Sequence, residues 1–420
     1  NFVACNITGN TFILQLCLAQ DCKMKLHIFS LLQVVLYFSV MGTNGGDKKL
    51  FCLLSKHMGD FQQEKELAKL CSHLSASWSF VIGGLWDIQE SRKPQSPFLE
   101  ENPSDEELID DLHAHSSKTK ILFMATLIPP PANRDFIDNT TVAIKKLIEN
   151  TKEKGYDGIV IGHAQNVSVD LYQTFLELLI RARRELKFVS FELHVLLKPS
   201  PRFMGANIWR QYDKEIHSYI LHMGTFTKLG NPYPYSPLKG DENNTIVSRV
   251  RDWKKGGINM KKAIGLLHPG MRAYSLQNGK TDGKTVAIDP HFLDYDYACK
   301  LLDRSKPIPW DFSRQTFSEL VYENETAWRS IDDITSTIEK VKYFLDEGMA
   351  GVGIQSPHES AWMYHLDDCA KLRNIHAQAV TAYFSGQDVQ KVADRERRVM
   401  FRMNDTFWDK TKIIINKILV

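Results

Sequence analysis

The sequence predicts an α/β protein folded as a (β/α)8 TIM barrel, in which eight parallel strands close into a ring inside a layer of helices. Short apolar runs alternate with longer amphipathic runs along the chain, and this alternation is typical of a parallel sheet covered by helices. The apolar runs are nearly unbroken, as expected for strands buried on both faces. About eight such units favour a closed barrel. An open, doubly wound sheet is the alternative, but the sequence has no GxGxxG or P-loop fingerprint to favour it.

The expected strands are rich in Val, Ile, Leu and Phe, and they span residues 49–54, 78–85, 120–127, 156–163, 188–197, 216–223, 262–267 and 350–355. The expected helices follow a period of about 3.6 residues, and they span residues 61–73, 103–115, 134–154, 169–186, 209–214, 245–256, 331–347 and 366–384. Ser104 and Glu107 form a capping box at one helix start, and Gly155 and Gly348 follow two helix ends. Between residues 274 and 321 the pattern breaks into a stretch rich in Gly, Pro, Asp and Tyr.

The composition narrows the class of protein. The chain has 420 residues, of which 43% are hydrophobic and 24% charged, as in an ordinary globular protein. Its 52 basic and 50 acidic residues nearly cancel, so no nucleic-acid partner is expected. The seven cysteines include no CxxC pair, which argues against a zinc site. We therefore expect no metal and no cofactor.

The N-terminal region predicts secretion. A weakly basic segment (24–27), an apolar run (28–40) and a small, polar exit (42–46) follow one another in the order of a signal peptide, which we place at residues 24–46. The apolar run is short for a membrane span, so the mature form should not lie in a membrane. Residues 1–23 precede the plausible start at Met24 and are expected to be a translated upstream tract. The mature protein should be extracellular.

Secretion gives meaning to the cysteines and to the N-x-[ST] sequons. Four cysteines remain after the leader, and they suggest two disulfides in an oxidising compartment. Of the three possible pairings, the local pair Cys52–Cys71 with Cys299–Cys369 is our choice. Five sequons predict N-glycosylation at surface positions, at Asn139, Asn166, Asn243, Asn324 and Asn404.

Several segments carry a resemblance to a known family: Phe51-Cys52 with 71–74, then 134–137 with 155–159, then 295–299, 341–351 and 362–369. Their order and spacing resemble glycoside hydrolase family 18, the chitinases and chitinase-like proteins. The resemblance implies a barrel over residues 47–390, followed by a C-terminal tail over 391–420. It also implies a small, shortened α+β insertion domain at about residues 274–321, between strand seven and its helix.

The fourth strand carries the chemistry of that family, with the pattern D-G-x-D-x-D-x-E. In the family the final Glu is the general acid, and the preceding Asp orients the substrate's N-acetyl group for attack on the anomeric carbon. Asp157 and Gly158 match this pattern, but Val160, Gly162 and Ala164 replace the three acids. Alternate residues of a strand share a face, so these three should point into the barrel. The resemblance therefore implies a pseudoenzyme without catalytic residues, in which Asp157 is structural.

Other groups are candidates for a rearranged catalytic site. His163 is adjacent, but strand alternation turns it outward and favours a buried, hydrogen-bonded histidine. Glu192 and His194 are two residues apart on strand five and share a face. His358 and Glu359 follow strand eight. None of these pairs forms a recognised hydrolase motif.

The sugar-binding surface also departs from the family pattern. The third and sixth strands lack the S-x-G-G-W and Met-x-Tyr-Asp sequences, and Gln355 takes the place of a tryptophan at the end of strand eight. The loops after barrel strands emerge on the functional face, so their aromatic residues are candidates for stacking on sugars, with packing as the alternative. The candidate ligand-binding residues are Trp86, Trp209, Tyr233, Tyr235, Gln355 and Trp362. A glycan at Asn166 would stand beside the mouth of the barrel.

The sequence thus favours a secreted, catalytically inactive chitinase-like protein. Its expected partner is chitin or another glycan that contains N-acetylglucosamine, or a protein. The alternatives are an active glycosidase with rearranged acids and a purely protein-binding, growth-factor-like barrel. A barrel scaffold does not by itself imply activity, so the missing acids weigh more than the fold.

Overall fold

A computed structural model describes most of the chain between residues 48 and 400. The described residues are 48–54, 61–81, 104–127, 136–163, 167–188, 190–199, 203–204, 208–224, 235–240, 244–276, 287–294, 320–323, 327–356, 372 and 374–400.

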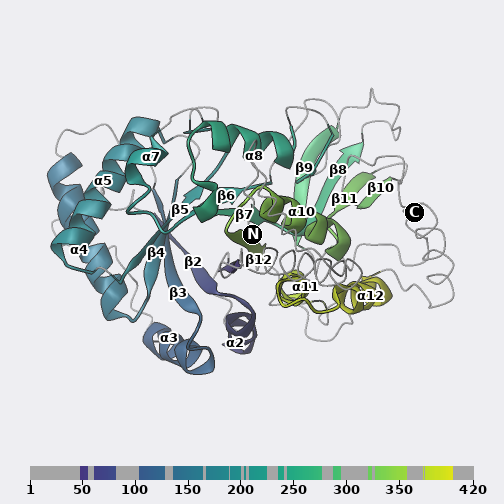
Figure 1. The fold of residues 1–420 in the computed structure, drawn as a ribbon, viewed down its shortest axis with the longest axis horizontal. Coiled ribbons are helices and arrows are strands. Elements are labelled where there is room, and N and C mark those ends of the chain that lie inside the picture. The colour runs from purple at the N-terminus through teal and green to yellow at the C-terminus, as the bar shows by residue number, and fades with distance from the viewer. Residues whose placement is uncertain are drawn as a thin grey trace, which may run out of the picture. The chain divides into compact units, whose positions relative to one another are not determined.

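Eight parallel strands form a closed barrel, which confirms the predicted fold class (Figure 1). The strands are β1 (Lys49–Leu54), β2 (His73–Val81), β3 (Lys120–Leu127), β4 (Gly158–His163), β5 (Glu192–Leu197), β6 (Ser218–His222), β7 (Ala263–Leu267) and β12 (Gly351–Ser356). They follow one another around the ring in chain order, and β12 closes it against β1, where Leu53 lies opposite Gln355.

The second strand starts earlier than the sequence predicts. It begins at His73 rather than at residue 78, and the preceding helix ends at Leu70 rather than at residue 73. The first residues of β2 are His73-Leu-Ser75, of which His73 and Ser75 are buried although polar. Because His73 and Ser75 are polar, the start of β2 does not appear in the sequence as an unbroken apolar run.

The helices fall within a few residues of the predicted ones, with two exceptions: the helix expected at 366–384 begins only at Ile375, and a further helix at Val389–Met400 was not predicted. They are α2 (Phe61–Leu70), α3 (Ser104–His115), α4 (Phe136–Glu153), α5 (Val169–Glu185), α7 (Trp209–Tyr212), α8 (Ile246–Lys255), α10 (Ile334–Asp346), α11 (Ile375–Phe384) and α12 (Val389–Met400), with a 3-10 turn at Met260–Lys262. Side-chain caps fix several starts: Ser168 accepts from Leu171 N–H, and Asp333 from Ser336 N–H. None of the described helices is long and apolar enough to cross a membrane.

The segment expected as a C-terminal tail begins inside a helix. In α12, the buried carboxylate of Glu396 accepts hydrogen bonds from the backbone N–H of Ile334, at 3.0 and 3.2 Å. This contact ties α12 to the first turn of α10, so the folded unit extends beyond residue 390. The helix is highly charged in sequence, which is why it reads as a solvated tail.

Two separate apolar clusters fill the barrel fold. The inner cluster consists of Phe51, Leu53, Leu122, Val160, Leu196, Ile220, Ile264 and Leu266, all on barrel strands. The outer cluster joins the other face of the strands to the helices. In β4, Val160 belongs to the inner cluster, whereas Ile159 and Ile161 belong to the outer one. Strand alternation therefore sets which side chains face the barrel interior.

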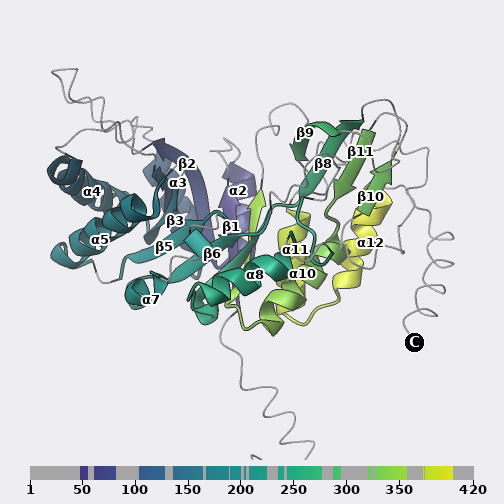
Figure 2. The same cartoon turned by 90° about the horizontal axis from the view of Figure 1, so that it is seen from above.

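A second sheet lies between β7 and α10 in the sequence. It is antiparallel, in the order β10-β11-β8-β9, and its strands are β8 (Gly270–Leu276), β9 (Ala287–Asp294), β10 (Leu320–Glu323) and β11 (Ala327–Ile331). Figure 2 shows these strands side by side. The sheet begins before residue 274 and ends after residue 321, so its strands overrun both limits expected for the insertion.

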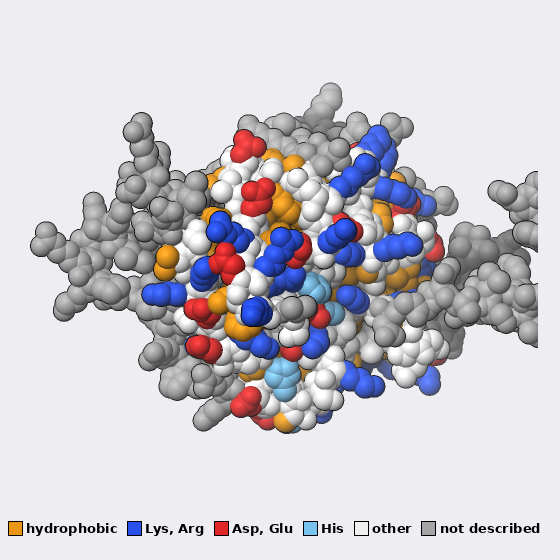
Figure 3. Space-filling view, turned by 60° about the vertical axis from the view of Figure 1, so that its left-hand side comes forward, with side chains coloured by type: hydrophobic (Ala, Val, Ile, Leu, Met, Phe, Trp, Pro, Cys, Tyr) orange, Lys and Arg blue, Asp and Glu red, His pale blue; other side chains and the backbone are white. Residues whose placement is uncertain are grey.

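Charges of both signs are interspersed on one face of the described part of the protein (Figure 3). On the face shown in Figure 3, Lys and Arg side chains are interspersed with Asp and Glu. On α5, for example, Arg181 pairs with Glu185, and Arg183 reaches Glu215 at 2.9 Å. This mixture agrees with the near-zero net charge.

A disulfide joins Cys52 of β1 to Cys71, which lies just before β2, as predicted. The two Cα atoms are 5.9 Å apart, within the range that a disulfide spans without backbone movement. Cys299 and Cys369 lie outside the described residues.

Removal of this disulfide is the first testable prediction. The bond closes a loop with a sequence separation of 19 residues, and a loop of this length restricts the unfolded chain by about 3 kcal/mol. The Cys52→Ala, Cys71→Ala variant should therefore lose about 3 kcal/mol of unfolding free energy in urea titrations. Wild-type protein in reducing buffer should lose at least as much, because the reductant also opens the predicted Cys299–Cys369 bond. An unchanged midpoint in both experiments would contradict the prediction.

Candidate functional site

The inner face of β4 carries no titratable side chain in the part of the strand that the structure describes. Val160 is fully buried in the inner cluster, in register with Met124 of β3. Gly162 lies opposite Thr126, and a Cβ at this glycine would lie 3.6 Å from Leu196 Cδ2 and 3.6 Å from Thr126 Oγ1. These neighbours place Gly162 on the inner face as well. The predicted orientation of both residues is confirmed, and Ala164 lies outside the described residues.

Asp157 lies at the opposite, amino-terminal end of β4. Its carboxylate accepts a hydrogen bond from Ile121 N–H at 2.9 Å and another from Lys120 Nζ at 3.2 Å. His113 Nε2 lies 3.5 Å from the same carboxylate. These contacts tie β4 to the start of β3. They agree with the structural role expected for Asp157.

His163 is a packed histidine on the outer face of β4. Its ring stacks on Phe203, with centroids 4.2 Å apart, and meets Tyr172 edge-on. Its Nε2 accepts a hydrogen bond from Lys198 N–H at 3.3 Å. The side chain is buried away from the barrel interior, as the alternation predicts.

Polar side chains gather where β6 and β7 end. The Tyr235 hydroxyl lies 3.3 Å from His268 Nδ1, just after β7. The ring of Tyr235 lies so close to Gly224, just after β6, that a Cβ there would come within 2.2 Å of it. Arg249 donates to the backbone oxygen of His222 at 3.3 Å. The carboxyl ends of barrel strands are where ligands bind, so Tyr235 stands at the functional face.

Burial controls the ionisation of this group. It lowers the pKa of His222 to about 3 and that of His268 to about 4. Burial also lowers the pKa of the Arg249 guanidinium to about 9 and raises the pKa of Tyr235 above its usual range. At neutral pH both histidines and the tyrosine are therefore neutral, and they offer hydrogen bonds rather than charge.

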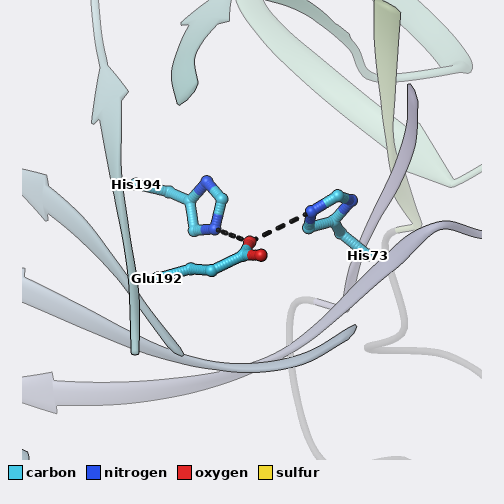
Figure 4. Close-up of side chains that lie close together, drawn as sticks. All are labelled: His73, Glu192 and His194. Atoms are coloured by element: carbon cyan, nitrogen blue, oxygen red, sulfur yellow. Dashed lines mark hydrogen bonds and ion pairs between the residues drawn. The ribbon is translucent and has the colours of Figure 1, made fainter. Parts of the chain in front are cut away.

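A second polar cluster lies at the amino-terminal end of the barrel (Figure 4). His194 Nε2 lies 3.0 Å from Glu192 Oε2, and His73 Nε2 lies 3.3 Å from the same oxygen. His73 is the first residue of β2 and Glu192 the first of β5. Gly158, the first residue of β4, lies opposite Glu192. The Glu192 and His194 pair thus lies at the end of the barrel away from Gly162.

The three side chains of this cluster have complementary ionisation states. Burial is the main cause that lowers the pKa of His194 to about 4, and it also lowers the pKa of His73. Burial alone would raise the pKa of Glu192, but hydrogen bonds and charges from the two histidines outweigh it and hold the pKa well below its usual range. At neutral pH the carboxylate is ionised and both imidazoles are neutral. Two imidazoles and one carboxylate, with ligand atoms all within 4.8 Å of one another, are a set that can hold a metal ion.

No protein-family model matches the sequence, and no curated protein matches it. Solved structures do match. A group IV chitinase from Ostrinia furnacalis, solved with allosamidin, is similar with a TM-score of 0.63 over 81% of this chain and 100% of its own, at 13% identity. A family 18 chitinase from Cycas revoluta, in complex with (GlcNAc)3, gives 0.59 over 80% and 100%, also at 13% identity. An immunomodulatory active chitinase from Trichuris suis gives 0.58 over 74% and 92%, at 14% identity.

This protein has the fold of the family 18 chitinases. Within this chitinase fold, Gln355 is the fifth residue of β12. It lies two residues after Gly353, where a Cβ would come within 2.9 Å of Leu266 Cδ1 and 3.5 Å of Ile264 Cγ2 and would therefore point into the barrel. Gln355 is half-buried and lies at the carboxyl end of the barrel, where the sequence places a ligand-binding residue.

Trp209 is not available to a ligand in this chitinase fold, so that prediction is wrong. The side chain is fully buried, and its Nε1 donates to Phe203 O at 3.2 Å. Its ring packs against Phe203, Tyr219 and Trp253. The short helix α7 turns the residue into the outer cluster, and the position of a tryptophan after a strand does not reveal this turn.

Several predicted positions lie outside the described residues: Trp86, Tyr233, Trp362, His358, Glu359, Asn166, Asn243, Asn324 and Asn404. Asn139 lies in α4. His73, the third member of the amino-terminal cluster, was not among the residues predicted from the sequence. Its signal is the alternation of His73 and Ser75 at the start of β2, which matches the alternation of Glu192 and His194 at the start of β5.

Proposed function

We propose that this protein is a secreted, catalytically inactive chitinase-like protein that binds oligosaccharides of N-acetylglucosamine at the carboxyl end of its barrel. One observation carries the proposal: Val160 and Gly162 take inward positions on β4 where the family's pattern requires acids. The fold supports the choice of ligand class, because similar chitinases were solved with (GlcNAc)3 and with allosamidin.

Loss of activity follows from the chemistry of the strand. Val, Gly and Ala side chains neither donate nor accept a proton, and they cannot orient an N-acetyl group by hydrogen bonding. General acid catalysis alone supplies a factor of about 10²–10⁴. Glu192 does not replace the acid, because it lies at the amino-terminal end of the barrel and is ionised by its two histidine partners.

Ligand binding, unlike hydrolysis, does not require a general acid on β4. Tyr235 offers an aromatic ring and Gln355 an amide at the carboxyl ends of β6, β7 and β12. Amides and aromatic rings are the groups that fix a sugar by hydrogen bonds and by stacking. Secretion is supported by the order of segments in the leader and by the disulfide between Cys52 and Cys71, a bond typical of oxidising compartments.

Turnover and binding measured together test this function. The secreted protein should release no fluorophore from a chitobioside above an empty-vector control, yet chitin oligomers should change its tryptophan fluorescence saturably. Gln355→Ala should weaken binding about 5- to 10-fold, the value of one hydrogen bond. Gln173→Ala on the exposed side of α5 is the matched control and should bind as wild type.

The outcomes distinguish the alternatives. Turnover that co-purifies with the protein and disappears on replacement of one carboxylate would contradict the inactive assignment and support a rearranged enzyme. No response to any oligomer, together with specific recovery of one protein in pull-downs, would replace the glycan ligand by a protein partner.

A further inference from the structure

The amino-terminal cluster of the barrel is the strongest polar feature that the proposed function leaves unused. Its three side chains come from strands that are not neighbours, β2 and β5, and they meet inside the ring. His194 is completely buried, His73 is 7% exposed and Glu192 is 20% exposed. The carboxylate is thus the most exposed of the three groups.

Ser72 contacts both the backbone of Leu50 and the ring of His73. Ser72 Oγ accepts from Leu50 N–H at 3.0 Å and donates to Leu50 O at 3.1 Å. The same Oγ lies 2.9 Å from His73 Nδ1, and while its proton is donated to Leu50 O, Nδ1 must supply the hydrogen of this contact. The Nε2 of neutral His73 then points a lone pair at the Glu192 carboxylate, 3.3 Å away. In this tautomer two lone pairs face each other, and a cation between them removes the repulsion. In the other tautomer Nε2–H of His73 donates to Glu192 instead.

His194 provides the second observation. Its Nδ1 is buried and has no hydrogen-bond partner among the described residues, while its Nε2 faces the same carboxylate oxygen. When its proton moves from Nε2 to Nδ1, the Nε2 lone pair also points at Glu192. The hydroxyl of Ser218, which lies opposite His194 in the register, is likewise buried without a partner in the described part of the chain. The cluster is therefore incompletely satisfied as a purely structural network.

The distances fit a tetrahedral ion. Zinc binds histidine nitrogen and carboxylate oxygen at about 2.0–2.1 Å, so its ligand atoms lie roughly 3.3 Å from one another. The two observed separations between Nε2 and Oε2 are 3.0 and 3.3 Å. Imidazole ligands favour zinc and other transition metals over magnesium and calcium, which prefer oxygen. Phe51 stacks on His73 at 4.0 Å between ring centroids and meets His194 edge-on at 5.3 Å, so both rings are held in place.

We propose that His73 Nε2, His194 Nε2 and Glu192 Oε2 bind one zinc ion at the amino-terminal end of the barrel, with water as the fourth ligand. Ser72 acts as a positioning residue that holds His73 in the binding tautomer. Lys120, whose charge opposes a cation nearby, is paired with Asp157. The ion links β2 to β5 across the ring, and because this end of a barrel serves stability rather than catalysis, the site is structural and independent of glycan binding.

Zinc titration of the full-length, metal-depleted protein tests the proposal. We expect one zinc per chain by elemental analysis, a higher melting temperature with zinc than with calcium, and the visible bands of tetrahedral cobalt when Co²⁺ replaces zinc. His194→Gln and Glu192→Gln should abolish stoichiometric binding. His115→Gln is the matched control, since His115 is an exposed histidine on α3, and it should bind as wild type.

A variant at the positioning residue separates zinc binding from a failure to fold. Ser72→Ala should bind zinc about 10- to 100-fold more weakly, the usual loss when a histidine ligand loses its supporting hydrogen bond, and should retain the tetrahedral cobalt spectrum. The cobalt spectrum of the wild-type protein tests the proposal without depending on whether any variant folds. Wild-type protein that takes up no zinc or cobalt would overturn the proposal. So would folded Glu192→Gln protein with wild-type affinity, because the metal would then lie elsewhere.

Discussion

Replacing Lys340 by alanine should destabilise the protein by about 3–5 kcal/mol, the usual cost of leaving one member of a buried ion pair without its partner. Lys340 is completely buried on α10, and its Nζ pairs with Asp332 and donates to Ser236 Oγ at 2.9 Å. Ser236 in turn donates to Asp332 Oδ2 at 2.7 Å, and Ser336 donates to Oδ1 at 2.6 Å. Alanine would remove the cation and leave the carboxylate buried.

The same helix provides the control. Lys342 is two residues away and forms an exposed pair with Glu339 at 2.7 Å. Lys342→Ala should change the unfolding free energy by less than about 0.5 kcal/mol, because exposed pairs contribute little. Urea titrations of both variants measure the difference. Equal losses for the two lysines would show that the buried pair is no more important than a surface pair.

Lys340 and Asp332 are coupled through their ion pair, and a double variant tests this coupling. Lys340→Met with Asp332→Leu removes both charges and keeps the volume, so much of the stability lost in the single variant should return. If the double variant loses the sum of the two single effects, the residues act independently. This cluster joins the segment after β6 to the start of α10, so its loss should also loosen the position of Tyr235 beside Ser236.

Local rules predicted the barrel well where strands are uniformly apolar. The run at residues 120–127 coincides with β3, and that at 49–54 with β1. The same rules displaced β2, because polar His73 and Ser75 face inward at its start. Inner polar positions violate the apolar pattern where the interior holds a polar cluster, so the misplaced strand marks the cluster of which only Glu192 and His194 were predicted.

Among the candidate functional residues too, local sequence predicted some positions and only the folded structure reveals the others. The inward direction of Val160 and Gly162 could be predicted, because it depends only on alternation within one strand. The burial of Trp209 could not, because it depends on a four-residue helix and on packing against Trp253, 44 positions later. Likewise, His73 and Glu192 are 119 residues apart and meet only when the barrel closes. The resemblance on strand four therefore predicted residues at the carboxyl end of the barrel, and it gave no information about the cluster at the amino-terminal end.

Acid should unfold this protein well before its carboxylates are protonated. Burial lowers the pKa of His222 and of His376 to about 3, and that of His194 and of His268 to about 4. In the unfolded chain these histidines titrate near 6.5, so below that pH the unfolded state binds more protons. The stability from keeping them neutral is complete above pH 6.5 and is lost as the pH falls towards 4.

The expected size of this loss is large. Each of the four histidines should cost about 1.3 kcal/mol between pH 7.5 and pH 5.5, or about 5 kcal/mol together, which is a large part of the stability of a typical domain. Urea titrations at both pH values and constant ionic strength measure it.

His376→Asn retains an acceptor for Thr337, which lies 2.9 Å from His376 Nδ1, and should reduce the pH dependence by one histidine's share. The exposed His115→Gln variant should leave it unchanged. A stability that stays level from pH 7.5 to 5.5 would mean that these side chains accept protons inside the folded protein, and that burial does not keep them neutral.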